Sequence, residues 1–292
     1  MNLTGRSETG CRQQNEDSFF IVNGPSSVYA AVSDGMGGHA AGEVASQTVC
    51  ATMSRYIDDH PREDGQFDEE DFNAALYAAY DALDARDTGD EKKMGTTLTF
   101  VKFHEGGCFT AHIGDSRIYH IRPSEKRILH VTRDHSLVNN LVELGEMTSE
   151  EAKTSRQKNV ITRAMQPHED RRSKADCFNL TDLRAGDYIY MCSDGMLEEM
   201  EDRELVNILS LPQPDVKKIG ILKGATKDNK DNHSAQLIRI VALNGEVTTQ
   251  TDNAFGKEKQ SNVFISNTRL LLIVAILLIL AVFVYLFFAH HA

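Results

Sequence analysis

Residues 28–39 have the sequence VYAAVSDGMGGH, in which an apolar run ends in an aspartate followed by glycines. A short apolar run rich in β-branched and aromatic residues is typical of a buried strand. Glycines at its end allow the backbone to approach a ligand closely. Asp34 therefore stands at a strand end, where its carboxylate can either brace a turn or bind a cation.

Aspartates occupy strand ends in three further places. They are Asp194 after the apolar run 188–192, Asp115 between the runs 108–113 and 117–121, and Asp231 before the run 236–243. Each alone could be a turn residue or a helix cap. Mg²⁺ and Mn²⁺ prefer carboxylate oxygens, however, and several strand ends together can hold two such ions. A two-metal site indicates phosphate-ester chemistry.

A candidate phosphate ligand lies near the N-terminus. Residues 12–17, RQQNED, place Arg12 close to Glu16 and Asp17. A guanidinium group binds phosphate bidentately, and the neighbouring carboxylates can support a metal centre. A surface ion pair between Arg12 and Glu16 explains the same residues equally well, so this segment alone leaves both interpretations open.

The remaining pattern predicts an α+β fold. Strands are predicted at 18–22, 28–33, 96–103, 108–113, 117–121, 188–192 and 236–243, and helices at 41–57, 72–83 and 137–144. Because the strands cluster instead of alternating regularly with helices, a layered sandwich is favoured over a doubly wound sheet. The acidic segment 63–71 shows no EF-hand spacing and is interpreted as a solvated loop.

Composition excludes several classes of protein. The 292 residues suffice for one large domain and an appendage, and 31 Lys and Arg against 43 Asp and Glu give a net charge of −12. That charge argues against nucleic-acid binding. The five cysteines are scattered and form no CxxC pair, which argues against a disulfide scaffold or a zinc site and favours a reducing compartment.

The C-terminal end predicts a membrane anchor. Residues 270–288 are apolar and uncharged, and a helix of that length spans roughly 28 Å, close to the hydrocarbon thickness of a bilayer. A transmembrane helix is therefore predicted at 270–289, although a buried core helix is the alternative. Lys257, Lys259 and Arg269 precede the run, so the upstream chain is expected in the cytoplasm. The polar segment 244–269 is predicted to be a flexible linker that follows a domain at 1–243.

Taken in order, these motifs resemble the bacterial form of the type 2C (PPM) metal-dependent serine/threonine protein phosphatases. The resemblance covers roughly residues 3–241. It rests on Arg12 with 15–17, and on 34–39, 95–97, 114–117, 134–136, 162–164, 193–195 and 231–232. It implies an αββα sandwich of two central antiparallel sheets flanked by helices.

The resemblance also implies roles for individual residues. Two Mn²⁺ or Mg²⁺ ions are expected on Asp34, the Gly35 carbonyl, Asp194 and Asp231. Glu16 and Asp17 match supporting positions, Asp17 through water, and Arg12 matches a phosphate-binding arginine. Asp115 matches a ligand of a third, weaker metal, and residues 134–162 match a flap beside the site. The implied catalytic set is Arg12, Asp34, Asp194 and Asp231.

The sequence departs from the family pattern at three points. Met36 stands where animal members have a histidine proposed as general acid, so the proton donor is left open between a metal-bound water and His39. Two Asp-Asn pairs occur at 228–229 and 231–232, and Ser234 at the family's Ser/Thr position favours the second. Residues 154–157 differ from the usual flap sequence.

The sequence therefore predicts a phosphatase that hydrolyses phosphoserine and phosphothreonine in proteins by direct attack of metal-activated water. It is expected at the bacterial cytoplasmic membrane, with one membrane span and its catalytic domain in the cytoplasm. Family analogy adds a Ser/Thr kinase as a partner. The alternative is a membrane-bound pseudophosphatase that only binds phosphoproteins. The presence of Asp34, Asp194 and Asp231 favours the enzyme.

Overall fold

The computed structural model of the chain describes residues 2–8, 10–24, 27–37, 41–87, 94–169 and 171–242. Contacts divide the chain into two units, Met1–Thr248 and Thr249–Ala292. The predicted linker 244–269 and the predicted membrane helix 270–289 lie outside the described residues. Within the described ranges, no helix combines the length and the apolar character needed to cross a bilayer.

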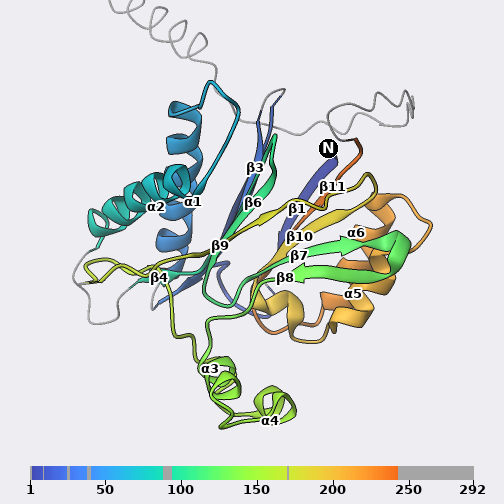
Figure 1. The fold of residues 1–292 in the computed structure, drawn as a ribbon. Coiled ribbons are helices and arrows are strands. Elements are labelled where there is room, and N and C mark those ends of the chain that lie inside the picture. The colour runs from blue at the N-terminus through green and yellow to red at the C-terminus, as the bar shows by residue number, and fades with distance from the viewer. Residues whose placement is uncertain are drawn as a thin grey trace, which may run out of the picture. The chain divides into compact units, whose positions relative to one another are not determined.

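Two antiparallel sheets form the centre of the first unit (Figure 1). Sheet A has the order β1 (Asn2–Glu8), β11 (His233–Arg239), β10 (Tyr188–Cys192), β7 (Arg117–Arg122) and β8 (Arg127–Val131). Sheet B has the order β2 (Asp17–Asn23), β3 (Val28–Met36), β5 (Leu98–His104), β6 (Gly107–Ile113) and β9 (Asp176–Leu180), with β4 (Gly95–Thr96) paired to β3. Most strands that follow each other in the chain pair within one sheet, as β2 with β3, β5 with β6, β7 with β8 and β10 with β11, and the two sheets face each other.

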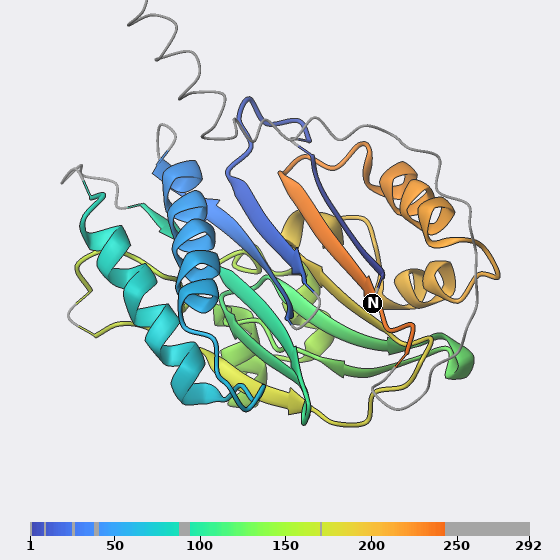
Figure 2. The same cartoon turned by 90° about the horizontal axis from the view of Figure 1, so that it is seen from above.

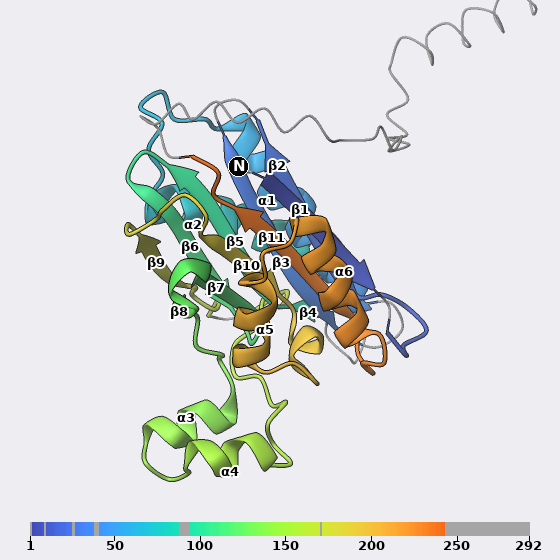
Figure 3. The same ribbon diagram turned by 90° about the vertical axis from the view of Figure 1, so that its right-hand side faces the viewer.

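Helices cover the outer faces of the sheets (Figure 2). On sheet B lie α1 (Ala41–Asp59) and α2 (Glu69–Asp84), and on sheet A lie α5 (Asp202–Leu209) and α6 (Asp215–Thr226). A separate pair, α3 (Leu137–Glu143) and α4 (Ser149–Thr154), projects away from the sandwich (Figure 3). The remaining helical turns are η1 (Pro123–Glu125) and η2 (Asp194–Leu197). This arrangement confirms the predicted αββα sandwich.

Strand β3 shows how the sequence builds these layers. Tyr29 and Ala31 belong to the apolar cluster under α1 and α2, whereas Ala30 and Val32 belong to the cluster between the two sheets. Successive side chains of a strand point to opposite faces. A strand packed on both faces must therefore be apolar throughout, which explains the continuous run that precedes Asp34.

The acidic segment 63–71 is a loop only as far as residue 68, and the predicted loop is wrong for residues 69–71, which form the first turn of α2. Arg62 binds the carboxylates of Asp64, Asp68 and Asp71 at 2.7, 2.7 and 3.0 Å. Asp68 also caps α2, because its side chain accepts from the backbone N–H groups of Glu70 and Asp71. The carboxylates therefore serve helix initiation and pairing with Arg62.

Several elements were not predicted from the sequence, and one strand was predicted at the wrong position. The predicted strand 236–243 is wrong in its bounds, since β11 begins at His233 and ends at Arg239. His233 and Ser234 are polar residues that are buried, His233 beside α6 and Ser234 between the sheets, so the apolar pattern concealed the start of the strand. Strands β1, β8 and β9 and helices α4, α5 and α6 were not predicted, because they are short or have weak apolar periodicity.

The core under α2 yields a stability prediction. Phe72 is fully buried, and its ring lies 5.4 Å from that of Phe100 and 5.5 Å from that of Phe109. Phe72→Ala should lower the free energy of unfolding by about 3 to 5 kcal/mol, because it leaves a cavity. Tyr77→Ala, on the exposed side of the same helix, should cost far less. Urea unfolding measures both, and similar losses in the two variants would contradict this packing.

Candidate functional site

The aspartates singled out in the sequence meet at one end of the sandwich. Asp17 opens β2 and lies directly opposite Asp34, near the end of β3. Asp194 follows β10, and Asp231 precedes β11. Because β2 and β3 belong to sheet B while β10 and β11 belong to sheet A, both sheets contribute carboxylates to one cluster.

The carboxylates of this cluster repel one another in a largely dry environment. Burial, and then the charges of Asp17, Asp194 and Asp115, raise the pKa of Asp34 well above its ordinary value. Burial likewise raises the pKa of Asp17 to about 7 and that of Asp115 to about 7. The pKa of Asp194 is also raised by burial, and a hydrogen bond joins its side chain to that of Asp34. Without cations, the cluster retains protons that free carboxylates would lose.

Two of the buried carboxylates have unsatisfied oxygens. Asp17 Oδ2 accepts a hydrogen bond from Ser193 Oγ at 2.8 Å, but Asp17 Oδ1 is buried without a partner, and so is Asp115 Oδ1. A buried carboxylate oxygen without a partner is costly. Since carboxylate oxygens are the preferred ligands of Mg²⁺ and Mn²⁺, the donor set fits divalent cations. Ser193 is a supporting residue that the sequence analysis did not assign.

Threonines hold the Asp34 peptide in place. The Asp34 N–H donates to Thr97 Oγ1 at 2.9 Å, and the Thr97 N–H donates to the Asp34 carbonyl at 2.8 Å. Thr96 Oγ1 donates to the same carbonyl at 2.9 Å. The Thr97 hydroxyl also lies 2.7 Å from Ser116 Oγ, which follows Asp115. The motif at 95–97 therefore positions Asp34 and links it to the turn that carries Asp115.

Glycines are required where the Asp-Gly pairs pass other segments. A Cβ atom on Gly35 would lie 2.2 Å from the Gly42 carbonyl oxygen and 2.5 Å from that of Glu16. A Cβ atom on Gly195 would lie 2.1 Å from the Asn232 carbonyl oxygen. No side chain fits at such distances. Gly35 instead donates its N–H to the Glu16 carbonyl at 3.1 Å, which joins β3 to the segment before β2.

Arg12 lies at the rim of the carboxylate cluster. Its Nη2 contacts Asp231 Oδ2 at 2.7 Å, and 57% of the arginine side chain is exposed. This hydrogen bond raises the pKa of Arg12, whereas burial raises the pKa of the neighbouring Glu16. Arg12 thus forms an ion pair with Asp231 of the cluster. The alternative considered from the sequence was a surface ion pair between Arg12 and Glu16.

The two Asp-Asn pairs differ in exposure and contacts. The Asp228 side chain is 88% exposed, against 33% for Asp231, which contacts Arg12. Asn229, next to Asp228, donates its side-chain N–H to the Gly195 carbonyl at 2.5 Å and so supports the Asp194 turn. Asp231 therefore belongs to the cluster, and Asp228 does not. His39, one of the open alternatives for a proton donor, lies outside the described residues.

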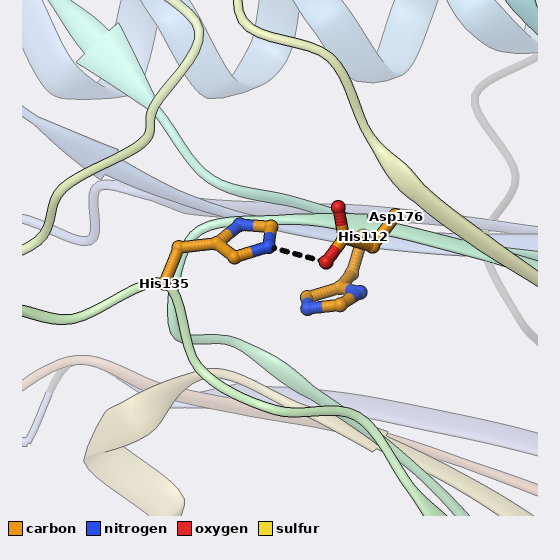
Figure 4. A group of neighbouring side chains, drawn as sticks. All are labelled: His112, His135 and Asp176. Atoms are coloured by element: carbon orange, nitrogen blue, oxygen red, sulfur yellow. Dashed lines mark hydrogen bonds and ion pairs between the residues drawn. The ribbon is translucent and has the colours of Figure 1, made fainter. Parts of the chain in front are cut away.

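A second group of side chains connects the ends of the predicted flap 134–162 (Figure 4). His135 Nε2 lies 3.1 Å from Asp176 Oδ2, and Arg163 Nη1 lies 2.7 Å from Asp176 Oδ1. The His112 ring stacks on that of His135 at 4.5 Å. His112, His135 and Asp176 are close enough for a metal site. The Arg163 cation already pairs with Asp176, however. We therefore interpret the group as a structural contact that links the two ends of the segment 134–162, which sequence patterns did not reveal.

Comparison with known proteins agrees with this geometry. The profile of the family Protein phosphatase 2C matches residues 4–216. The serine/threonine protein phosphatase PstP of Mycobacterium tuberculosis is 36% identical over 218 residues, which are 73% of this chain and 40% of that protein. Protein phosphatase PhpP of Streptococcus pneumoniae is 31% identical over 223 residues, which are 73% of this chain and 86% of that protein. The matched region thus spans less than half of the mycobacterial relative.

Solved structures give the same result. A crystal structure of the Mycobacterium tuberculosis phosphatase superposes with a TM-score of 0.71 at 33% identity, covering 82% of this chain and 99% of that one. The catalytic domain of PstP in complex with two manganese ions superposes with a TM-score of 0.66 at 32% identity, covering 82% and 98%. From its sequence match and its fold, the chain belongs to the protein phosphatase 2C family.

Proposed function

We propose that the chain is a protein serine/threonine phosphatase that hydrolyses phosphoserine and phosphothreonine with the help of two Mn²⁺ or Mg²⁺ ions. The observation that carries this proposal is the carboxylate cluster built from both sheets, in which Asp17 and Asp115 have buried, unpartnered oxygens. The two manganese ions of the related PstP catalytic domain support the choice of metal.

The residues assigned to the cations are those expected from the sequence. Asp34, the Gly35 carbonyl, Asp194 and Asp231 would hold the pair, and Glu16 and Asp17 would support it. Asp115 would serve a third, weaker cation. The chemistry that bound cations supply is activation of water and neutralisation of charge on the phosphoryl group.

The protein's own side chains orient the phosphate. The Arg12 guanidinium carries five N–H donors, and its exposed position leaves donors free to bind phosphoryl oxygens while Asp231 holds one end. Asn232 anchors the segment that carries Arg12. Its Oδ1 accepts from the Glu16 N–H at 2.8 Å, and its Nδ2 donates to the Gln14 carbonyl at 2.9 Å. Arg12 is thereby held over the cluster before substrate arrives.

The alternative of a pseudophosphatase that only binds phosphoproteins is less well supported. Every carboxylate that the resemblance requires is present, and four of them, Asp17, Asp34, Asp194 and Asp231, lie together. The relatives are named phosphatases. A binding module would not need to retain carboxylates whose mutual repulsion destabilises the fold.

The proposal extends to the cellular setting. Residues 270–289 form a single transmembrane helix at the bacterial cytoplasmic membrane, and residues 244–269 tether the catalytic domain on the cytoplasmic side. Phosphorylated proteins, including a Ser/Thr kinase, are the partners. The uncharged apolar sequence of 270–288 and the preceding basic residues support this arrangement.

The two Asp-Asn pairs provide a test of the proposed function. With a phosphothreonine peptide and Mn²⁺, Asp194→Asn and Asp231→Asn should each lose at least about 100-fold in kcat/KM, because a carboxylate ligand is removed. Asp228→Asn is the matched control, and its activity should stay within about twofold of wild type. Phosphate release measures all three. Full hydrolysis in excess chelator, with metal removal verified, would rule out the two-metal proposal.

The raised pKa values predict how stability depends on pH. Burial raises the pKa values of Asp17 and Asp115 from 3.8 to about 7, so the folded chain binds protons more tightly than the unfolded chain. In excess chelator, thermal stability should therefore fall as the pH rises from about 4 to about 7. Saturating Mn²⁺ should raise Tm by roughly 5 to 10 °C at pH 7.5.

Circular dichroism melting at several pH values measures this effect. At pH 5 the gain from Mn²⁺ should be smaller, because protons compete with the cation. Asp115→Asn should flatten the decline seen in chelator, since it removes one repelling charge. A Tm in chelator that rises between pH 5 and pH 7 would contradict the proposed carboxylate repulsion.

Membrane attachment is tested by fractionation. The full chain should sediment with membranes and require detergent for release, whereas a chain that ends at Leu243 should be soluble and hydrolyse the same phosphopeptide. Protease added outside spheroplasts should leave the catalytic domain intact. Recovery of the full chain in the soluble fraction without detergent would refute the proposed anchor.

A further inference from the structure

A groove of about 920 Å³ runs between β2 and α1. At one end it is lined by Asn15 and Asp17, next to the carboxylate cluster. Helix α1 begins near the same place, because a Cβ atom on Gly35 would lie 2.2 Å from the Gly42 carbonyl oxygen. The helix packs along β2 (Figure 3). Both elements begin beside the cluster, β2 at Asp17 and α1 at Ala41, and so run away from it. The groove therefore leads from the site along the flank of sheet B.

The groove follows the free edge of β2. This strand is the end strand of sheet B, and the consecutive residues from Asp17 to Phe20 all line the groove. Successive side chains point to opposite faces of a sheet, so a cavity lined by all of them must lie along the strand edge. Phe19 is 36% exposed, and β2 beyond Asp17 has no buried residue. An apolar edge of this kind is a template for an added strand.

The opposite wall of the groove is acidic. Glu43, Asp58 and Asp59 line it on α1, against one basic residue, Arg55. From Glu43 to Asp58 the helix extends about 22 Å, a length that accommodates about seven residues of extended chain. An extended segment with lysine or arginine side chains would therefore meet opposite charge along the groove.

We propose that this groove binds the segment of a phosphoprotein substrate that precedes the phosphorylated residue, as an antiparallel strand on β2, and that it selects basic side chains. The inference rests on the proposed function. Because β2 runs away from the cluster, an antiparallel segment runs towards it and brings the residue at its C-terminal end to Arg12. Strand addition of this kind supplies main-chain hydrogen bonds, and the acidic wall supplies specificity.

Side chains already engage two main-chain groups of β2. The Asp17 N–H donates to Asn15 Oδ1 at 3.1 Å. Gln236 Nε2, from β11, donates to the Phe20 carbonyl at 2.8 Å. The added strand would therefore pair with the rest of the edge. A second copy of this chain is a poorer occupant, because symmetrical pairing of two β2 edges would bring Glu43, Asp58 and Asp59 against the same acidic wall of the partner.

The experiment compares three substrates of the full chain in detergent with Mn²⁺. Two phosphothreonine peptides differ only in carrying lysine or glutamate at several of the seven positions before phosphothreonine. The third substrate, para-nitrophenyl phosphate, is too short to reach the groove when its phosphate is bound at the cluster. The lysine peptide should be hydrolysed with about tenfold higher kcat/KM. This preference should weaken with added salt, because the charges are exposed.

Two variants locate the preference in the groove. Asp59→Lys should raise KM for the lysine peptide about three- to tenfold and leave para-nitrophenyl phosphate hydrolysis unchanged. Glu105→Lys makes the same charge change at the exposed turn between β5 and β6 and should leave both unchanged. Ala51→Trp, which fills the groove from exposed helix surface, should raise KM for both peptides but not for the small substrate.

The outcomes separate this inference from the proposed function. Equal kcat/KM for the two peptides would overturn the groove assignment, and so would peptide kinetics that are unchanged in both Asp59→Lys and Ala51→Trp. In either case metal-dependent hydrolysis of para-nitrophenyl phosphate would persist, so the proposed function would stand. A wild-type dimer that Ala51→Trp converts to a monomer in analytical ultracentrifugation would assign the groove to a second copy and likewise overturn it. Absence of hydrolysis of any substrate would instead refute the proposed function.

Discussion

The site depends on forcing like charges together between two sheets. Asp17 and Asp34 face each other across β2 and β3, and Asp194 reaches Asp34 from the opposite sheet. Burial and mutual repulsion raise the pKa values of all three, so the fold carries an electrostatic cost at this end. A cation binding site follows directly, because positive charge is what relieves such a cluster.

Short hydrogen bonds and close approach of backbone segments offset part of this electrostatic cost. Ser193 donates to Asp17, and Thr97 fixes the peptide of Asp34 from both sides. Gly35 and Gly195 let neighbouring segments pass at distances that no side chain would permit. These small residues draw the two sheets together at one end, while the apolar clusters hold the sandwich elsewhere.

Charge also shapes what can approach the site. The chain is strongly acidic, yet Arg12 stands exposed at the rim of the cluster, where a phosphate would otherwise meet only carboxylates. The acidic wall of α1 lies beside the same site along the groove of β2. A substrate that combines a phosphate with a basic flanking segment would match both features.

Local sequence patterns were enough to predict the layered α+β class and the aspartates of the cluster, because the apolar run before Asp34 and the Asp-Gly pairs are local signals of strand ends. It could not determine that Asp17 lies opposite Asp34, that Ser193 donates to Asp17, or that Asp176 joins His135 to Arg163. Those relations bring residues distant in the chain into hydrogen-bond contact, and only the pairing of strands and the packing of two sheets decide them. The polar start of β11 escaped prediction for the same reason, since Ser234 becomes buried only when the sheets meet and His233 only when α6 packs on sheet A.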